Sequence, residues 1–499
     1  MEYVEKNVEK AMNILRCTSK VKYGSHPSIG LMMYRALILA RIDYGSIVYG
    51  SAAKSHLKKL ETVQHRAIRL CLGALGSSPT NSLKVEANTE PLHLRRNRLT
   101  TKFLATRMHD PNHPVVTGLD ALAVTALSDP HKSPRVTPPL LETHMKMKSI
   151  SLGKIIRSSN TKLHWLIPLF APKVITCLQE LKGEQDYIKV CFETGKSPLA
   201  TVVYTDGSKS QCGVGAAILN INNDYSRQFK LPPLCTIFSA EAIAIREAIK
   251  YIKQTKPAKT IICSDSLSVL TALKKTDTPE DPIILEIKNI LLAGGSGITT
   301  HLLWVKGHNN NRFNQRVDAL AKAAALSGND IKEISAGDIV SHNRVLLRKK
   351  WQSEYEQSSK SKGIWYSAAQ PNIQSKPWFS NVKRNRKFFT TICRLRFNHN
   401  KLPSHLHKIG ITQTSKCSCD GTTTADANHI ILGCPLKTTG REHIFMALKK
   451  YKIPLPTTVL IDSMNSYASE ELRTYQRFSK LLAMASVLPS TPRCPQDPE

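Results

Sequence analysis

Four acidic residues in the middle of this chain have the spacing and surroundings to act together. Asp206 follows a β-branched run, Glu241 lies one turn into a helical pattern, Asp265 follows an apolar run, and Asp318 lies on a later helix. A sheet brings strand ends together, so these carboxylates can converge, and their repulsion would keep some of them protonated. Divalent cations remove that penalty, and Mg²⁺ takes oxygen ligands while retaining water for a substrate phosphate. Two such ions ~3.5–4 Å apart would activate water for phosphodiester cleavage and stabilise the leaving oxygen.

Each acid taken alone also has an ordinary structural explanation. The Asp206-Gly-Ser sequence is typical of a turn, and Glu241 near a helix start is a favourable partner of the helix dipole. Asp265, just before Ser266, could cap the next helix. Four acids in this order, on these elements, favour a joint role over four separate ones.

Strand and helix patterns alternate around the acids and predict a mixed-sheet α/β domain. The predicted strands are 199–205, 213–220, 225–231, 260–263 and 298–305. The predicted helices are 238–253, 266–275, 282–292 and 312–326. The order β-β-β-α-β-α-β-α places the acids at element boundaries within about 130 residues.

The charge of the chain points to a polyanionic partner. The 499 residues include 70 Lys plus Arg against 38 Asp plus Glu, a net charge of +32. Residues 198–330 hold 15 basic and 11 acidic residues, so a charge of +28 falls on the rest of the chain. Basic flanks around a near-neutral centre fit nucleic-acid binding by the flanks and carboxylate chemistry in the centre, although Lys and Arg can also simply solvate helix faces.

Composition also excludes several classes of protein. A hydrophobic fraction of 41% and a charged fraction of 22% are typical of globular proteins. No apolar run approaches the ~18 residues of a membrane span, and the charged start MEYVEKNVEKAMNILR lacks the apolar block of a secretory signal. Twelve scattered cysteines indicate reduced thiols. We therefore expect an intracellular protein with no membrane segment, in the nucleus or the cytoplasm.

Helical and proline-rich patterns divide the rest of the chain. Apolar spacing predicts helices before residue 128, prolines interrupt the chain near 129–140, and basic helical patterns return after 330. We assign residues 1–128 to a helical region, 129–197 to a linker with weakly structured helical segments, 198–330 to the α/β domain, 331–488 to a basic helical C-terminal region, and 489–499 to a disordered tail.

Four motifs of the central domain resemble ribonuclease H. They are Tyr204-Thr-Asp-Gly-Ser-Lys, Phe238-Ser-Ala-Glu-Ala-Ile-Ala-Ile, Cys263-Ser-Asp-Ser-Leu-Ser-Val-Leu, and Trp304-Val-Lys-Gly-His through Val317-Asp-Ala-Leu-Ala-Lys. The resemblance implies a ribonuclease H-like mixed five-stranded sheet with helices, flanked by mainly α-helical basic regions. It also implies a hydrolase that cuts the RNA strand of RNA–DNA hybrids.

The resemblance assigns a role to each site residue. Asp206, Glu241, Asp265 and Asp318 would ligate two Mg²⁺ ions, which Mn²⁺ can replace, and His308 matches the mobile-loop histidine that assists proton transfer or product release. The loop after His308 departs from the family pattern. Gln315 replaces the usual acid and Phe313 stands where glycine is usual. The metal ligands are retained, but the mobility of this loop is open to question.

Segments on the N-terminal side resemble the region after the polymerase palm in non-LTR retrotransposon reverse transcriptases. They are residues 37–45, 60–70 and 86–96. A polymerase palm needs a paired-aspartate motif, and the chain contains no Asp-Asp dipeptide. We therefore expect the fingers and palm to be absent, polymerase activity to be lacking, and Met1 to start inside a longer parent reading frame.

A second candidate metal site lies near the C-terminus. Cys417, Cys419, His429 and Cys434 could form a closed tetrahedral Zn²⁺ site. The Cys-x-Cys spacing matches no common zinc finger, but the segment from Arg394 to Cys434 resembles C-terminal regions of retroelements. The alternative is two buried thiols and one exposed thiol without a metal.

The leading hypothesis is a Mg²⁺-dependent endonuclease acting on RNA–DNA hybrids within a retrotransposon-derived protein. A catalytically inactive, nucleic-acid-binding remnant of a retroelement is the alternative, although the intact set of four acids speaks against it. An interaction protein that binds host factors through its helical flanks is a third hypothesis, which no residue supports specifically.

Overall fold

The computed structural model divides the chain into two compact units. One contains residues 1–96 and 347–499, and the other contains residues 97–346. The structure describes residues 2–21, 23–128, 137–150, 153–157, 172, 174–175, 201–257, 259–276, 281–293, 299–307, 311–427, 429–436, 446 and 450. No helix among these residues has both the length and the apolarity needed to cross a membrane.

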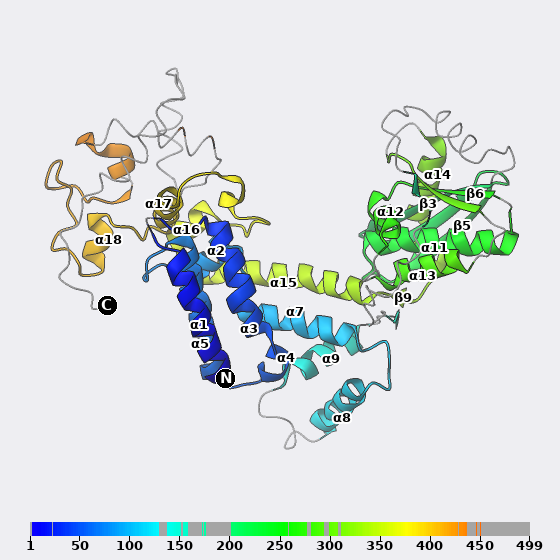
Figure 1. The fold of residues 1–499 in the computed structure, drawn as a ribbon, viewed down its shortest axis with the longest axis horizontal. Helices are drawn as coiled ribbons and strands as arrows, with labels where there is room; N and C mark the ends of the chain where they lie inside the picture. The colour runs from blue at the N-terminus through cyan, green and yellow to red at the C-terminus, as the bar shows by residue number, and fades with distance from the viewer. Residues whose placement is uncertain are drawn as a thin grey trace. The chain divides into compact units, whose positions relative to one another are not determined.

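The second unit is built on a mixed sheet, of which β3, β5 and β6 are labelled in Figure 1. Its central strands are β3 (Thr201–Ser210), β4 (Gly213–Asn220), β5 (Tyr225–Leu231), β6 (Lys259–Ser264) and β7 (Thr299–Trp304). The pairs β3–β4 and β4–β5 are antiparallel, whereas β3–β6 and β6–β7 are parallel. The two-residue strands β2 (Val174–Ile175) and β8 (Asn329–Asp330) extend the edges, giving the order β2-β7-β6-β3-β4-β5-β8. The predicted α/β class is confirmed, with seven strands in place of the expected five.

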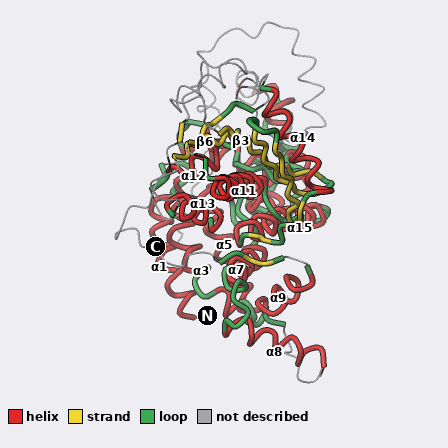
Figure 2. Tube along the Cα trace, turned by 90° about the vertical axis from the view of Figure 1, so that its right-hand side faces the viewer, coloured by secondary structure: helices red, strands yellow, loops and turns green. Residues whose placement is uncertain are grey.

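Helices cover both faces of this sheet, and Figure 2 shows the yellow strands between them. On one face, α14 (Arg312–Ser327) packs against Tyr204 and neighbouring apolar side chains. On the other face, α11 (Ile237–Thr255), α12 (Leu267–Lys274) and α13 (Pro282–Leu292) pack against Val203 and Ile262. Adjacent residues of β3 therefore serve opposite layers, as the two-residue period of a strand requires.

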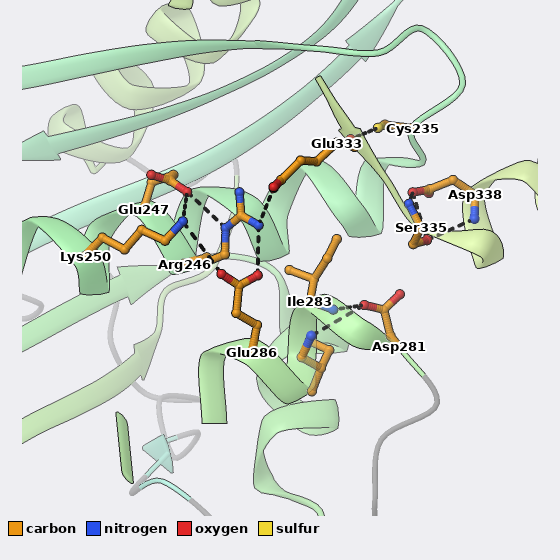
Figure 3. A network of polar contacts seen from close by, with 11 residues as sticks. Cys235, Arg246, Glu247, Lys250, Asp281, Ile283, Glu286, Glu333, Ser335 and Asp338 are labelled. Atoms are coloured by element: carbon orange, nitrogen blue, oxygen red, sulfur yellow. Dashed lines mark hydrogen bonds and ion pairs between the residues drawn. The ribbon is translucent and has the colours of Figure 1, made fainter. Parts of the chain in front are cut away.

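A network around Arg246 and Asp338 holds the chain that follows the sheet onto α11 (Figure 3). Arg246 is 2% exposed and donates to Glu247, to Glu286 of α13 and to Glu333 of β9 (Glu333–Ile334). Asp338, near the start of α15 (Ala336–Ser359), accepts hydrogen bonds from the Thr236 backbone and the Ser239 hydroxyl. The unit therefore continues past α14 into the start of α15.

The N-terminal part of the same unit is helical. It contains the end of α7 (Leu92–Ala105), α8 (Pro114–Ser128) and α9 (Pro139–Ser149), and β1 (Lys154–Ile155) pairs in parallel with β9. Leu104, Leu119 and Leu141 belong to the same apolar core as α11 and α13. These helices are thus joined to the α/β layers by buried side chains.

The first unit is helical and combines both ends of the chain. Its elements are α1 (Glu2–Thr18), α2 (Pro27–Met33), the π-helical η1 (Tyr34–Leu39), α3 (Ala40–Asp43), α4 (Ser46–Tyr49), α5 (Lys54–Leu72), α6 (Thr80–Glu86), the start of α7, the end of α15, α16 (Ile364–Ala369), η2 (Trp378–Asn381), α17 (Arg386–Phe397), α18 (Pro403–Lys408) and η3 (His429–Gly433). One apolar core contains Leu60 and Ile68 together with Phe389 and Phe397.

A buried ion pair joins the two ends within this helical unit. The Arg396 guanidinium and the Glu86 carboxylate are 3.0 Å apart, with side chains 0% and 1% exposed. Tyr366 Oη donates to Glu86 Oε2 at 2.8 Å, and Trp378 Nε1 donates to Glu86 Oε1 at 2.6 Å. The carboxylate thus has several donors, as a buried charge requires.

Candidate active site

Strand register places two of the four acids side by side. In the parallel pair β3–β6, Thr205 lies opposite Ser264, so Asp206 and Asp265 follow directly paired positions. The Thr205 hydroxyl also donates to the Cys263 carbonyl at 3.2 Å, which joins the two strands just before the acids. The convergence of these two carboxylates is therefore a consequence of strand order.

Glu241 reaches the same place from α11. This helix begins after Thr236, whose hydroxyl accepts from the Ser239 backbone amide at 3.2 Å and caps it. A side-chain carbon at Gly207 would lie 2.5 Å from the Glu241 backbone nitrogen, so only glycine lets β3 approach this turn of the helix. Gly207 therefore allows β3 to pack closely against α11, and β3 continues through Asp206 and Gly207 instead of ending in a turn there.

The three carboxylates form a compact, mostly buried cluster. Each of Asp206, Glu241 and Asp265 offers an oxygen, and these oxygens lie within 4.8 Å of one another. Asp206 and Glu241 are 5% and 7% exposed. Asp206 Oδ2 and Glu241 Oε2 are buried, and neither has a hydrogen-bond partner in the part of the chain that the structure describes. Buried oxygens without donors are costly, so the cluster as it stands is electrostatically incomplete.

The pKa values of Asp206 and Glu241 reflect the lack of donors to their buried oxygens. Burial, with added repulsion from Asp265 and Asp318, raises the pKa of Asp206 to about 8. Burial also raises the pKa of Glu241 well above its usual value, and Asp206 and Asp265 add to the effect, although a hydrogen bond from the Gly207 amide opposes it. Either protons or a cation must balance the cluster at neutral pH, and an all-oxygen donor set fits Mg²⁺.

Asp265 is held by side chains that sequence reasoning did not place at the site. Trp304 Nε1 donates to the Asp265 carbonyl at 3.1 Å, and Asn314 Nδ2 donates to Asp265 Oδ2 at 3.4 Å. A side-chain carbon at Gly307 would come within 3.0 Å of Asp265 Oδ2, so glycine keeps this side open. Trp304 and Asn314 both lie in the fourth motif noted in the sequence, but their contacts with Asp265 depend on how β7 and α14 pack.

Asp318 stands slightly apart from the other three acids. It lies on α14 and is not among the oxygens that fall within 4.8 Å of one another, yet its charge still raises the pKa of Asp206 and Glu241. Its Oδ2 is 2.6 Å from the Lys322 ammonium one turn along the helix. His308, the fifth predicted site residue, lies outside the described residues.

The comparisons with known proteins bear on this part of the chain. Residues 198–326 match the RNase H family. This range forms an RNase H domain. Strands β3 to β7 and helices α11, α12 and α13 lie within it, and so do the four acids. Among solved structures, RNase H1 from the halophilic archaeon Halobacterium salinarum NRC-1 is 18% identical with a TM-score of 0.22, covering 25% of this chain and 96% of that one. No curated protein matches the chain.

The predicted C-terminal ligand set also converges. Donor atoms of Cys417, Cys419, His429 and Cys434 all lie within 4.8 Å of one another. The Cys417 and Cys434 sulfurs are 3.8 Å apart, and the Cys419 sulfur is 3.2 Å from His429 Nε2. Despite the opposing effect of burial, hydrogen bonds led by one with the Cys419 backbone lower the pKa of Cys417 to about 7. Three sulfurs and one imidazole nitrogen are a donor set that suits Zn²⁺.

Turn geometry produces this convergence. Lys416 and Thr424 form an antiparallel bridge, and the Cys417 amide donates to the Thr423 carbonyl at 2.7 Å. Asp420 Oδ1 accepts from the backbone amides of Thr422 and Thr423, and Gly421 adopts a positive φ of 67°. The Cys-x-Cys pair therefore sits on a tight hairpin, and the short π-helical turn η3 brings in the histidine.

Proposed function

We propose that this protein hydrolyses the RNA strand of RNA–DNA hybrids in a Mg²⁺-dependent reaction. The observation that supports this most directly is the cluster of Asp206, Glu241 and Asp265, which has buried oxygens lacking donors, inside a domain that matches the RNase H family. Asp318 would complete the ligand set from α14.

The proposed chemistry assigns each residue a task. Asp206, Glu241 and Asp265 would hold Mg²⁺, and the bound metal would supply an activated water and stabilisation of the leaving oxygen for phosphodiester cleavage. Trp304 and Asn314 position the loop and carboxylate of Asp265. Lys322 holds Asp318 in an exposed ion pair, which competes with the metal for this carboxylate. RNA is distinguished from DNA by its 2′-hydroxyls and by the minor-groove shape of the hybrid.

A cleavage assay tests this function directly. Purified full-length protein is incubated with an RNA–DNA hybrid labelled on the RNA strand and Mg²⁺, with single-stranded RNA and duplex DNA as controls. We expect cleavage of the hybrid alone, lost in Asp206→Asn and retained in Asp224→Asn, because Asp224 is an exposed acid of the same domain paired with Arg316. Cleavage by Asp206→Asn at the wild-type rate would contradict the site assignment.

An inactive remnant would give a different result in the same assay. It would bind the hybrid but leave it intact at every Mg²⁺ concentration, and Asp206→Asn would bind as the wild type does. The buried acidic oxygens argue against this alternative, because a protein that only binds phosphates has no use for a costly negative cluster.

We also propose that the cluster of Cys417, Cys419, His429 and Cys434 binds Zn²⁺ as a structural ion. The close approach of all four donors supports this assignment. Elemental analysis of the purified protein is expected to give one zinc per chain, lost in Cys419→Ser and kept in Cys212→Ser, since Cys212 is exposed and distant in sequence. Absence of zinc from protein purified without chelators would refute it.

A retroelement origin and the lack of polymerase activity are further parts of the proposal. The three segments that resemble the region after the polymerase palm, residues 37–45, 60–70 and 86–96, contribute side chains to one helical core. Primer extension is the test. Synthesis of DNA on a primed template by the purified chain would show that the polymerase part of the proposal is wrong.

A further inference from the structure

A pocket of about 300 Å³ opens in the helical unit, between the end of α1 and the C-terminal half of α5. Arg16, Arg66 and Arg69 supply its polar side. Met12, Val21 and Leu70 supply an apolar wall. We call it the arginine pocket. It belongs to a different unit from the acidic cluster, so it is a separate feature of the molecule.

Charge in the arginine pocket is unbalanced. Glu9 Oε1 lies 2.7 Å from Arg16 Nη2 and 3.0 Å from Arg66 Nη2, so one carboxylate serves two guanidinium groups. Among the described residues, no carboxylate pairs with Arg69. Its Nη2 donates to the Ser78 carbonyl at 3.2 Å, and its buried Nε has no acceptor among them. Three guanidinium groups against one carboxylate therefore leave a net charge of +2 beside a space that an anion would complete.

Buried contacts hold this pocket in shape. Arg386 of α17 donates to the Leu70 carbonyl at 2.6 Å and to the Lys20 carbonyl at 3.3 Å. Arg394 Nε donates to the Gly73 carbonyl at 2.8 Å. Gly73 has φ +68°, and a side-chain carbon there would lie 2.5 Å from the Thr390 hydroxyl. The two walls are thus fixed by α17, and the site does not have to form at the cost of chain entropy when a ligand binds.

A buried polar residue lies beside the same space. Ser19 is 4% exposed and belongs to the lining, and its hydroxyl has no hydrogen-bond partner among the described residues. Guanidinium groups bind phosphate oxygens through paired N–H donors, and a hydroxyl can add a further donor. The apolar wall beside them offers contact to a sugar or base face. Pockets of this size are at the small end of ligand sites, ~300–1,000 Å³, which is enough for one nucleotide unit.

We propose that the arginine pocket binds a backbone phosphate of a nucleic-acid strand, with one nucleotide seated against its apolar wall. The net charge of +32 favours a polynucleotide over a small anion, because a long strand can engage other basic side chains as well. This contact does not depend on the cleavage reaction, and it gives the helical unit its own grip on the strand.

Binding of oligonucleotides that the nuclease cannot cut tests the proposal. Fluorescence anisotropy is measured on the full chain with a labelled single-stranded DNA and a labelled DNA duplex, over a series of salt concentrations. We expect Arg66→Gln and Arg69→Gln each to weaken binding about tenfold, as for loss of a charge-assisted hydrogen bond. The slope of log affinity against log salt should flatten by about 0.7–0.9 per variant.

Lys58→Gln is the matched control. It removes the same charge from an exposed position on the same helix but lies outside the pocket lining. We expect less than a twofold effect. Arg69→Lys retains the charge but not the paired donors, so it should weaken binding as Arg69→Gln does but leave the salt slope unchanged. An effect of Lys58→Gln equal to that of Arg66→Gln would show delocalised charge attraction and would overturn the pocket assignment.

Glu9→Gln provides a test in the opposite direction. Removing the carboxylate frees Arg16 and Arg66, so we expect affinity to rise about threefold, whereas the exposed-acid control Glu356→Gln changes nothing. Unchanged or weaker binding by folded Glu9→Gln would overturn the proposal. So would equally tight, Arg69-dependent binding of AMP or polyglutamate, which would identify a free nucleotide or an acidic protein as the ligand. Thermal unfolding confirms that each variant is folded.

Discussion

Asp206→Asn is expected to stabilise the metal-free RNase H domain while abolishing its activity. At pH 7 the folded protein holds a proton on Asp206, whose pKa is raised from 3.8 to about 8 by burial and by Asp265 and Asp318. An unfolded aspartate would not hold that proton. Binding it costs about 1.36 kcal/mol per pH unit above the unfolded pKa, or about 4 kcal/mol at pH 7. Asparagine carries no such cost.

The pH dependence of this penalty has a definite sign. Because the acid pKa is raised on folding, the folded state binds more protons, and stability falls as pH rises from about 4 to about 8. Below pH 4 the unfolded aspartate is protonated too, so the wild type and the variant should converge. Adding Mg²⁺ at pH 7.5 should stabilise the wild type and leave Asp206→Asn unaffected.

Hydrogen exchange with mass spectrometry measures the effect where it arises, in peptides from β3 and α11 of the full chain. We expect slower exchange in Asp206→Asn than in the wild type at pH 7.5 without metal, by a factor that corresponds to about 2–4 kcal/mol once relaxation of the cluster is allowed for. Asp224→Asn, an exposed acid, should match the wild type. Equal protection in all three proteins would refute the reasoning that Asp206 is a buried, uncompensated acid.

Three further predictions concern single contacts. Glu86→Gln leaves the fully buried Arg396 without its counter-charge, so the free energy of unfolding of the helical unit should fall by about 3 kcal/mol in denaturant titrations, whereas exposed Glu356→Gln should cost nothing measurable. Asn314→Ala removes a donor from Asp265 and should lower the rate of hybrid cleavage about tenfold without loss of stability. Gln315→Ala, at the neighbouring exposed position, should retain full activity. An equal loss of activity in both variants would contradict a specific role for Asn314. Lys322→Ala frees Asp318 from an exposed ion pair of about 0.2–1 kcal/mol, so the Mg²⁺ concentration for half-maximal cleavage should fall about two- to fivefold; a rise in that concentration would show that the lysine supports the site.

The sequence was most informative where local pattern determines position. Strands 213–220 and 225–231 and the helix 282–292 were predicted with the bounds that the structure has. Once strand order is known, Asp206 and Asp265 must be neighbours, because parallel pairing of β3 and β6 aligns the residues before them. The place of Glu241 one turn into the helix was also predicted, and α11 confirms it.

Contacts between distant segments were beyond such reasoning. Nothing in the periodicity of α6 or α17 indicates that Glu86 and Arg396 pair, since each reads as an ordinary charged residue on a helix. Trp304 reaches the Asp265 backbone through its side-chain orientation, which the sequence does not encode locally. The two-residue edge strands β2 and β8 are too short to give a pattern. By contrast, the Asp318–Lys322 pair has i,i+4 spacing and could have been predicted.

The pairing of Glu86 with Arg396 has a consequence for how the protein is made. Residues 1–96 leave the ribosome without the partners that complete their core, because α17 lies beyond the whole of residues 97–346. At ~5–20 residues per second, the roughly 290 residues between residue 96 and the start of α17 take on the order of 15–60 s to synthesise. During that interval the apolar faces of α1, α2 and α5 lack the α17 side chains that bury them in the folded unit, which makes the nascent chain prone to aggregation until α17 is synthesised.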